Sequence, residues 1–230
     1  MLLCITFRSS LLRVRQLVNQ IDHFMLAAPS LEEGEAWAED TFGVCPAYGG
    51  EHLGLGTRNT LLSLGEVYLE IIVPDPTQDL AGTFGEKLSK LSEPGLVTWA
   101  VQGNLNEISA GLIANGMQSI GPKRTERRTA EGELLVWDLL FAIDGAHGLQ
   151  MPFFIDWLDC PHPAAMNPDA GRFSSIQLTT PDANSLSRLL AGIDLDIEVT
   201  EGEPSLTVEI ESNCLVKLTS NAETNALSLI

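Results

Sequence analysis

The chain has 230 residues, of which 44% are hydrophobic, and its formal net charge at pH 7 is −18. This length and hydrophobic content are enough to bury a substantial core in one large or two small domains. The negative charge argues against nucleic acid or an anionic membrane surface as a partner. No apolar run approaches the roughly 20 residues that a membrane-spanning helix needs.

The first 20 residues differ from the rest because they contain three arginines and no acidic residue. Residues 11–20 can form an amphipathic helix with Arg13 and Arg15 on its polar side. The apolar stretch at residues 1–7 is short for a signal-peptide core, and no charged segment precedes it. We therefore expect an N-terminal extension at 1–20, either a helical arm packed on the domain or a poorly ordered leader, rather than a targeting segment.

The first structural unit is expected at residues 21–76. It consists of a strand, a helix that starts after Pro29 and Ser30, a glycine-rich passage and two strands, which we place at 21–28, 31–42, 49–56, 57–64 and 67–73. In the first strand, alternation puts His23 on the same face as Met25 and Ala27. In the last strand, Glu70 interrupts an otherwise apolar run. A buried carboxylate is costly unless a cation, a metal or several donors neutralise it, so His23 and Glu70 are predicted to point into one concavity.

The same order of elements recurs twice. In the second unit, at 95–158, Asn104 caps a helix that ends at Asn115 and Gly116, and strands follow at 121–129, 134–143 and 150–157. A weaker third unit, at 161–230, starts with a strand at 173–180 and a helix after Pro181 and Asp182, and it is either a third copy or an edge-covering extension. Because one copy cannot cover its own sheet face, we predict an α+β fold. Its repeated βαβββ modules form a cupped mixed sheet with helices on the outer face, and the paired modules occupy 21–160.

The four cysteines are widely spaced and form no CxxC pair. A structural zinc site is therefore not expected, and nothing requires an oxidising compartment. We interpret the cysteines as free thiols in a cytoplasmic protein. No phosphate-binding glycine loop and no nucleophile elbow occurs, so nucleotide-dependent and serine-hydrolase chemistry have no support.

A histidine in the first strand and a glutamate in the last strand of a βαβββ module resemble the vicinal oxygen chelate superfamily. More narrowly, the chain resembles the glyoxalase-like domain proteins over about residues 21–218, through four motifs: Ile21-Asp22-His23, Gly49-Gly50-Glu51-His52 with Gly56-Thr57-Arg58-Asn59, Tyr68-Leu69-Glu70, and Pro152-Phe153-Phe154-Ile155-Asp156-Trp157. The resemblance implies a divalent metal (zinc, iron(II), nickel or manganese) on His23 and Glu70, which are also the implied catalytic residues. In the second unit Val97 or Trp99 replaces the histidine and Phe153 or Phe154 replaces the glutamate.

Each candidate residue also has a structural interpretation. His23 is either a metal ligand or a histidine bonded to Glu70 without a metal. Two ligands bind a metal weakly, so His52 is the candidate third ligand; otherwise it is a loop residue among glycines. Arg58 and Asn59 alternate along one strand, and one of them is expected to face the cup, either to bind substrate or to make a structural hydrogen bond.

The remaining candidates are aromatic or basic. Trp99, Trp137, Phe153 and Trp157 either form core or line the pocket of a small ligand with an apolar part. The only basic cluster is Lys123, Arg124, Arg127 and Arg128, which is either a solvated hairpin or supplies one arginine to a substrate carboxylate. No role is assigned to His147 and His162.

The sequence thus favours a metal-dependent lyase, isomerase or dioxygenase-type enzyme acting on a small oxygenated substrate. The alternative is a protein that binds or sequesters a small molecule in the same cup without chemistry, because the second unit lacks the metal ligands. A third possibility is a fold that serves assembly, since exposed sheet edges can pair two chains into a homodimer.

Overall fold

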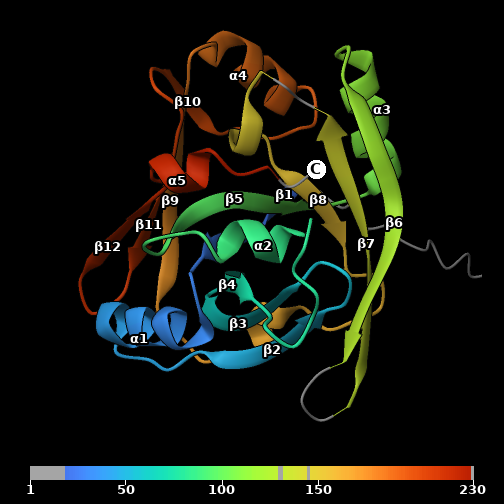
Figure 1. Ribbon diagram of the computed structural model, residues 1–230. Helices are drawn as coiled ribbons and strands as arrows, with labels where there is room; N and C mark the ends of the chain where they lie inside the picture. Colours follow the sequence, from blue (N-terminus) through green and yellow to red (C-terminus); the bar gives the residue numbers. More distant parts are fainter. Residues whose placement is uncertain (1–18, 129–131, 144–145, 229–230) are drawn as a thin grey trace, which may run out of the picture.

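The computed structural model describes residues 19–128, 132–143 and 146–228, and it contains two β-sheets of eight and four strands (Figure 1). Of the N-terminal extension predicted at 1–20, residues 1–18 lie outside this part of the chain. None of the helices described is long and apolar enough to span a membrane.

The eight-stranded sheet is built from two βαβββ modules. The first comprises β1 (Gln20–Ala27), α1 (Leu31–Phe42), β2 (Ala47–His52), β3 (Thr57–Leu64) and β4 (Val67–Pro74). The second comprises β5 (Gly95–Gln102), α3 (Leu105–Ala114), β6 (Gln118–Arg128), β7 (Leu134–Ile143), the 3-10 turn η1 (Gly148–Gln150) and β8 (Phe153–Asp156). The strand order is β2-β3-β4-β1-β5-β8-β7-β6. In each module the first strand runs parallel to the last, and β1 joins β5 in an antiparallel pair at the centre. The predicted α+β fold with a cupped sheet is confirmed.

The sheet curls until its two edges meet. The edge strands β2 and β6 come from different modules and lie at opposite ends of the strand order, yet they contact each other. This contact makes the concave face of the sheet an enclosed interior. Strand twist has a fixed hand in all sheets, and it accumulates over eight strands into such a curl.

The alternation predicted for β1 and β4 is present in the two clusters of buried side chains. Phe24, Leu26, Leu69 and Ile71 belong to the cluster on the outer face, together with residues of α1 and α3. Met25, Ala27, Tyr68 and Ile72 belong to the inner cluster. Each strand buries both of its faces, which explains why its sequence is an almost continuous apolar run.

The ends of the helices follow the sequence closely. Ser30 caps α1 by accepting a hydrogen bond from the Glu33 amide, and Gly43 ends the helix with a left-handed backbone. Asn104 caps α3 in the same way, as predicted. The connection after β4 contains the short helix α2 (Phe84–Leu88), which places Leu88 and Leu91 against the inner cluster.

After the 3-10 turn η2 (Pro163–Ala165), the third segment forms the second sheet. It consists of β9 (Arg172–Thr180), α4 (Ala183–Ala191), β10 (Glu198–Glu201), β11 (Ser205–Glu211), β12 (Leu215–Thr219) and α5 (Ala222–Asn225), with the strand order β10-β9-β11-β12. The elements keep the order of a βαβββ unit, but β9 pairs with β10 and β11 rather than with the last strand. Leu178, Leu206 and Val208 join the outer-face cluster, so this sheet covers the outer side of the first. We propose that the chain is divided into the paired modules at 21–160 and a third, weaker module at 161–230.

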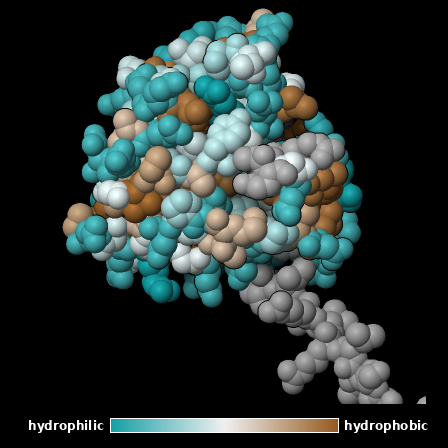
Figure 2. Space-filling view, turned by 90° about the horizontal axis from the view of Figure 1, so that it is seen from below, coloured by the Kyte–Doolittle hydropathy of each residue, from teal (hydrophilic) through white to brown (hydrophobic). Residues whose placement is uncertain are grey.

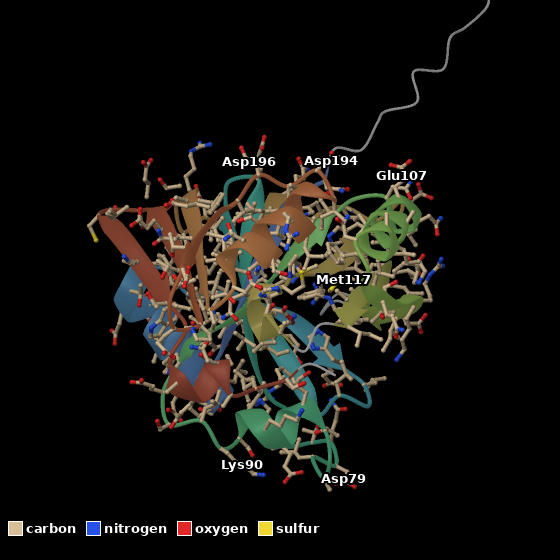
Figure 3. All side chains as sticks on the ribbon, turned by 90° about the horizontal axis from the view of Figure 1, so that it is seen from above. Asp79, Lys90, Glu107, Met117, Asp194 and Asp196 are labelled. Atoms are coloured by element: carbon tan, nitrogen blue, oxygen red, sulfur yellow. The ribbon has the colours of Figure 1, made fainter. Side chains whose placement is uncertain are left out.

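On the face seen in Figure 2, the hydrophobic side chains of the described residues form separate areas among hydrophilic ones. Figure 3 shows Asp194, Asp196 and Glu107 at the periphery, pointing away from the molecule. The acidic charge of the chain is therefore displayed to solvent at these positions, whereas the interior of the curled sheet holds a separate set of polar groups.

Candidate functional site

The strands β1 and β4 bring His23 and Glu70 together inside the curled sheet. The two strands are parallel neighbours in which Met25 lies opposite Glu70. His23 Nε2 lies 3.5 Å from Glu70 Oε2, and the two residues are only 2% and 5% exposed. The pair predicted from alternation is thus assembled and shielded from solvent.

Asp22 is the residue that holds the His23 ring. The pairing of β1 with β5 shifts register between Ile21 and His23, which allows two consecutive side chains to share the inner face. Asp22 Oδ1 lies 2.6 Å from His23 Nδ1, and Asp22 Oδ2 lies 3.0 Å from both Trp157 Nε1 and His162 Nε2. Burial raises the pKa of this carboxyl, but the hydrogen bonds from His162 and His23 and their charges together lower the pKa by more than burial raises it, so that the pKa is about 2.

The hydrogen bonds around Asp22 fix which nitrogen of each ring carries the proton. His162 Nδ1 accepts a bond from the Ala164 amide, so His162 Nε2 donates to Asp22. The ionised Asp22 accepts from His23 Nδ1, which leaves His23 Nε2 as a lone pair in the neutral ring. That lone pair faces a carboxylate oxygen of Glu70. Two acceptors at this distance require a proton or a cation between them.

Asn59 and His52 surround the second oxygen of Glu70. Asn59 Nδ2 donates to Glu70 Oε1 at 2.6 Å and lies 3.3 Å from His52 Nε2. His52 Nε2 is itself 3.8 Å from Glu70 Oε1, while His52 Nδ1 lies 3.0 Å from Thr57 Oγ1. Burial lowers the pKa of His52, Glu70 opposes this, and Arg127 and His23 add to the lowering. His52 is therefore predominantly neutral at pH 7.

Aromatic rings enclose His23 on two sides. Tyr68 stacks on its ring with centroids 4.5 Å apart, and Phe153 from the second module meets it edge-on at 5.3 Å. Burial, with the nearby charges of Asp22 and Glu70, raises the pKa of Tyr68 well above its ordinary value, so its hydroxyl stays protonated. These rings exclude water from the histidine.

Arg127 brings a positive charge to the same interior from β6. It is 8% exposed, and its Nη1 atom has no hydrogen-bond partner among the described residues. Burial lowers the pKa of its guanidinium, an effect that Tyr68 and Glu70 oppose. Arg127 Nη1 and Asn59 Oδ1 both lie close to Gly49, and Asn59 is bonded to Glu70, although Arg127 and Glu70 form no ion pair within the described part of the chain.

The other candidate residues are divided between the outer and the inner face of the sheet. Trp99 is fully buried in the outer-face cluster and donates its Nε1 hydrogen bond to the Gln150 carbonyl. Trp137 belongs to the inner cluster, where it packs against Trp157 at 5.3 Å. Arg58 follows the alternation of β3 to the side opposite Asn59. The structure thus brings His23, Glu70, His52, Asn59 and Phe153 together, and leaves Arg58 and Trp99 away from them.

The donor set fits a divalent metal in part. A separation of 3.5 Å is about what two ligands show when each lies roughly 2.1 Å from one metal ion. A carboxylate behind the opposite nitrogen of the histidine is the usual support for a metal-bound imidazole. Within the described residues, however, no group of three or more His, Cys, Asp or Glu side chains is arranged to hold a metal. The contact of His52 Nε2 with Asn59 Nδ2 keeps His52 from acting as a third ligand in this arrangement.

Sequence reasoning missed the supporting residues. Asp22 carried a signal, since it is an acid inside an apolar strand, and the same argument that singled out Glu70 applies to it. His162 and Trp157 carried none, because their approach to Asp22 depends on how the segment after β8 folds back. Arg127 belongs to the basic cluster that was expected either to form a solvated hairpin or to supply one arginine to a substrate carboxylate, but the sequence did not indicate which arginine.

Comparisons with known proteins agree with this architecture. A family model described as a glyoxalase-like domain matches residues 21–193. A hypothetical protein from Staphylococcus aureus is similar in structure, with a TM-score of 0.64 and 17% identity over 88% of each chain. A mutant of 4-hydroxymandelate synthase from Streptomyces coelicolor has a TM-score of 0.52 and 11% identity over 90% of this chain and 64% of that one. Methylmalonyl-CoA epimerase from Mycobacterium tuberculosis has a TM-score of 0.47 and 19% identity over 68% and 97%.

No curated protein matched the sequence. The family match covers most of the chain. The chain belongs to the glyoxalase-like domain family.

Proposed function

We propose that this protein is a metal-dependent enzyme, of the lyase, isomerase or dioxygenase type, that acts on a small oxygenated substrate. His23 and Glu70 are the proposed metal ligands and catalytic residues, and His52 is the proposed third ligand. The observation that carries the proposal is the 3.5 Å distance between His23 Nε2 and Glu70 Oε2 in the buried interior.

The alternative to a metal at this position is a proton, which would make the pair an ion pair of imidazolium and carboxylate. A protonated ring would have a carboxylate on each side, Asp22 at Nδ1 and Glu70 at Nε2. The same two carboxylates also suit a divalent cation, which would be zinc, iron(II), nickel or manganese. When bound, such an ion supplies Lewis-acid polarisation of substrate oxygens.

The residues of this chain have separable roles in the proposal. Asp22 fixes the orientation and tautomer of His23. Asn59 holds Glu70 Oε1, which leaves Oε2 directed at His23. Tyr68 and Phe153 keep water away from the imidazole, and Phe153 offers an apolar surface to the substrate.

The third ligand requires a local rearrangement. His52 is neutral, as a ligand must be, but its Nε2 atom faces the Asn59 amide nitrogen. A rotation of that amide would free His52 Nε2. It would also remove a donor from Glu70 Oε1, which a cation would then replace.

Metal binding tests the proposal directly. Protein purified without chelators is analysed for metal, and metal-free protein is titrated calorimetrically with zinc, iron(II), nickel and manganese. The test variant is Glu70→Gln, which keeps the side-chain shape and removes the charge. The matched control is Glu66→Gln, an exposed change in the hairpin between β3 and β4.

We expect one metal per chain in the wild-type protein and in Glu66→Gln. We expect Glu70→Gln to fold and to bind metal at least about 10-fold more weakly, because a ligating carboxylate is lost. Metal-free wild-type protein whose stability none of the four metals changes would contradict the proposal.

A non-catalytic binding protein is the second candidate. It is favoured by the second module, where β8 carries Phe153 and Phe154 in place of a carboxylate. In that case a ligand would co-purify with the protein, and its affinity would be the same in His23→Ala and in the presence of a chelator.

Light scattering over a concentration series tests the proposed homodimer, and fractionation of cells tests the proposed cytoplasmic location.

A further inference from the structure

Arg127 is buried at the seam where the curled sheet closes. It lies near the end of β6, and the opposite edge of the sheet, β2, packs alongside. Arg127 Nη1 would lie 2.7 Å from a Cβ atom placed on Gly49 of β2, and Asn59 Oδ1 would lie 2.2 Å from it. Arg127 therefore reaches across the seam toward Asn59, the residue that holds Glu70.

Both of these atoms lack partners. Among the described residues, Arg127 Nη1 and Asn59 Oδ1 are buried without a hydrogen bond. A guanidinium has five N–H donors and cannot lose its charge in a protein. Leaving such a group unpaired in the interior is costly, so the Arg127 N–H indicates a position prepared for a group with acceptor atoms. Asn59 Oδ1 is itself an acceptor and requires a donor.

The neighbouring basic residues do not share this environment. Lys123 and Arg124 are exposed on the same strand, and Arg124 is paired with Asp138 through two hydrogen bonds. Arg127 alone of these three is buried and faces the interior. The position is thus specific, and the charge is not part of a solvated basic face.

The charges around the position decide the class of ligand. Glu70 and the ionised Asp22 already bring two negative charges to this interior. These charges repel an added anion, and they repel a dianion such as phosphate about twice as strongly as a monocarboxylate. A monocarboxylate matches one guanidinium, which can bind both of its oxygens at once.

We infer that Arg127 binds the carboxylate of a small monocarboxylate, and so orients it beside His23 and Glu70. This inference rests on the proposed function, because it names the substrate class of the same site. Arg127 is then a substrate-binding residue contributed by the second module to a site built on the first.

The experiment measures carboxylate binding to metal-free full-length protein, so that its result does not depend on the metal. Pyruvate and lactate are the probes, methyl pyruvate is the neutral analogue and inorganic phosphate is the dianion. Dissociation constants come from ligand-observed NMR titrations. The variants are Arg127→Gln and Arg127→Lys, with Arg124→Gln as the control, since it removes the same charge from the same strand.

We expect pyruvate or lactate to bind the wild-type protein and Arg124→Gln equally, and to bind Arg127→Gln at least about 10-fold more weakly, as the loss of charge-assisted hydrogen bonds predicts. Methyl pyruvate and phosphate should bind at least about 10-fold more weakly than pyruvate. Arg127→Lys keeps the charge in the interior and therefore the fold, and it should still weaken pyruvate binding because it cannot bind both oxygens.

The inference is overturned if Arg127→Lys and Arg127→Gln bind pyruvate as the wild type does, if the Arg124 variant loses as much affinity as the Arg127 variants, or if methyl pyruvate or phosphate binds as well as pyruvate. The two proposals fail separately. Loss of metal binding in Glu70→Gln with unchanged pyruvate binding in the Arg127 variants supports the metal site alone. The reverse pattern supports the carboxylate site alone.

Discussion

Asp22 Oδ1 and His23 Nδ1 lie 2.6 Å apart although the two residues are consecutive in one strand. Consecutive side chains of a regular strand point to opposite faces. The irregular pairing of β1 with β5 removes that restriction at this point, and it gives the histidine a carboxylate support from its own strand. The predictions below test this support and the packing around it.

Replacing Asp22 by Asn should destabilise the protein by about 1–3 kcal/mol, because an amide cannot accept from all three donors that surround the carboxylate. Urea denaturation at pH 7 measures the change. The control is Asp196→Asn, an exposed residue that points away from the molecule in Figure 3, and it should change stability by less than about 0.5 kcal/mol. Equal stability of Asp22→Asn and the wild type would show that the network does not support the fold.

Replacing Trp157 by Phe removes the Nε1 donor to Asp22 Oδ2 together with part of the ring volume, and keeps an aromatic ring against Trp137. We expect a loss of about 1 kcal/mol in the free energy of unfolding. The Asp22→Asn and Trp157→Phe double variant should lose less than the sum of the two single changes, because both remove the same bond. If the losses of the two single variants add exactly in the double variant, the hydrogen bond between Trp157 and Asp22 contributes nothing to the free energy of unfolding.

Gly34 is a glycine inside helix α1, where alanine would ordinarily favour the helix by about 1 kcal/mol. Here a Cβ atom would lie 2.8 Å from Ile71 Cγ2 and 3.3 Å from Ala28 Cβ. Gly34→Ala should therefore destabilise the protein by about 1–3 kcal/mol, because the helix must move away from β4. Thermal unfolding measures this. Glu39→Ala, on the exposed side of the same helix, should be neutral or stabilising, and a stabilised Gly34→Ala would refute the close packing.

Asp75, directly after β4, should make stability depend on pH. It accepts hydrogen bonds from Thr77 N, Thr77 Oγ1 and Gln78 Nε2. Burial raises its pKa, but the bonds from Gln78 and Thr77 outweigh this, so the pKa lies below the ordinary 3.8. A carboxyl with a lowered folded-state pKa adds stability above its unfolded pKa and loses it as the pH falls through the folded value.

Asp75→Asn should therefore be less stable than the wild type by about 1 kcal/mol at pH 7. The difference should shrink as the pH falls below 3.8. Urea denaturation of both proteins across this pH range provides the measurement. A stability difference that stays constant with pH would mean that the variant is destabilised by the changed shape of the side chain and not by the loss of its charge.

Much of the fold was predictable because its signals are local. The alternation in β1 and β4 placed His23 and Glu70 on one face, and Asn104 marked the start of α3. The repeated order of elements led to the paired modules. The strand pairing of the last segment was not predictable from that order, since β9 takes β10 and β11 as neighbours.

The site was predictable only where a residue breaks the pattern of its own strand. Glu70 does so, and so does Asp22. Trp99 shows the limit of alternation, since it lies on the outer face although Val97, two residues earlier in β5, lies in the inner cluster, next to a register shift in the pairing with β1. Arg127 shows the other limit, because its approach to Asn59 and Gly49 depends on β6 meeting β2.

The sequence by itself determined which strands and helices form, which faces of β1 and β4 are polar, and which family the chain resembles. These properties follow from backbone geometry and from neighbours a few residues apart. Only the tertiary structure decided which carboxylate supports His23 and which arginine enters the site. Those contacts join residues far apart in the chain or depend on one irregular strand pairing, and the curl of the whole sheet fixes their distances.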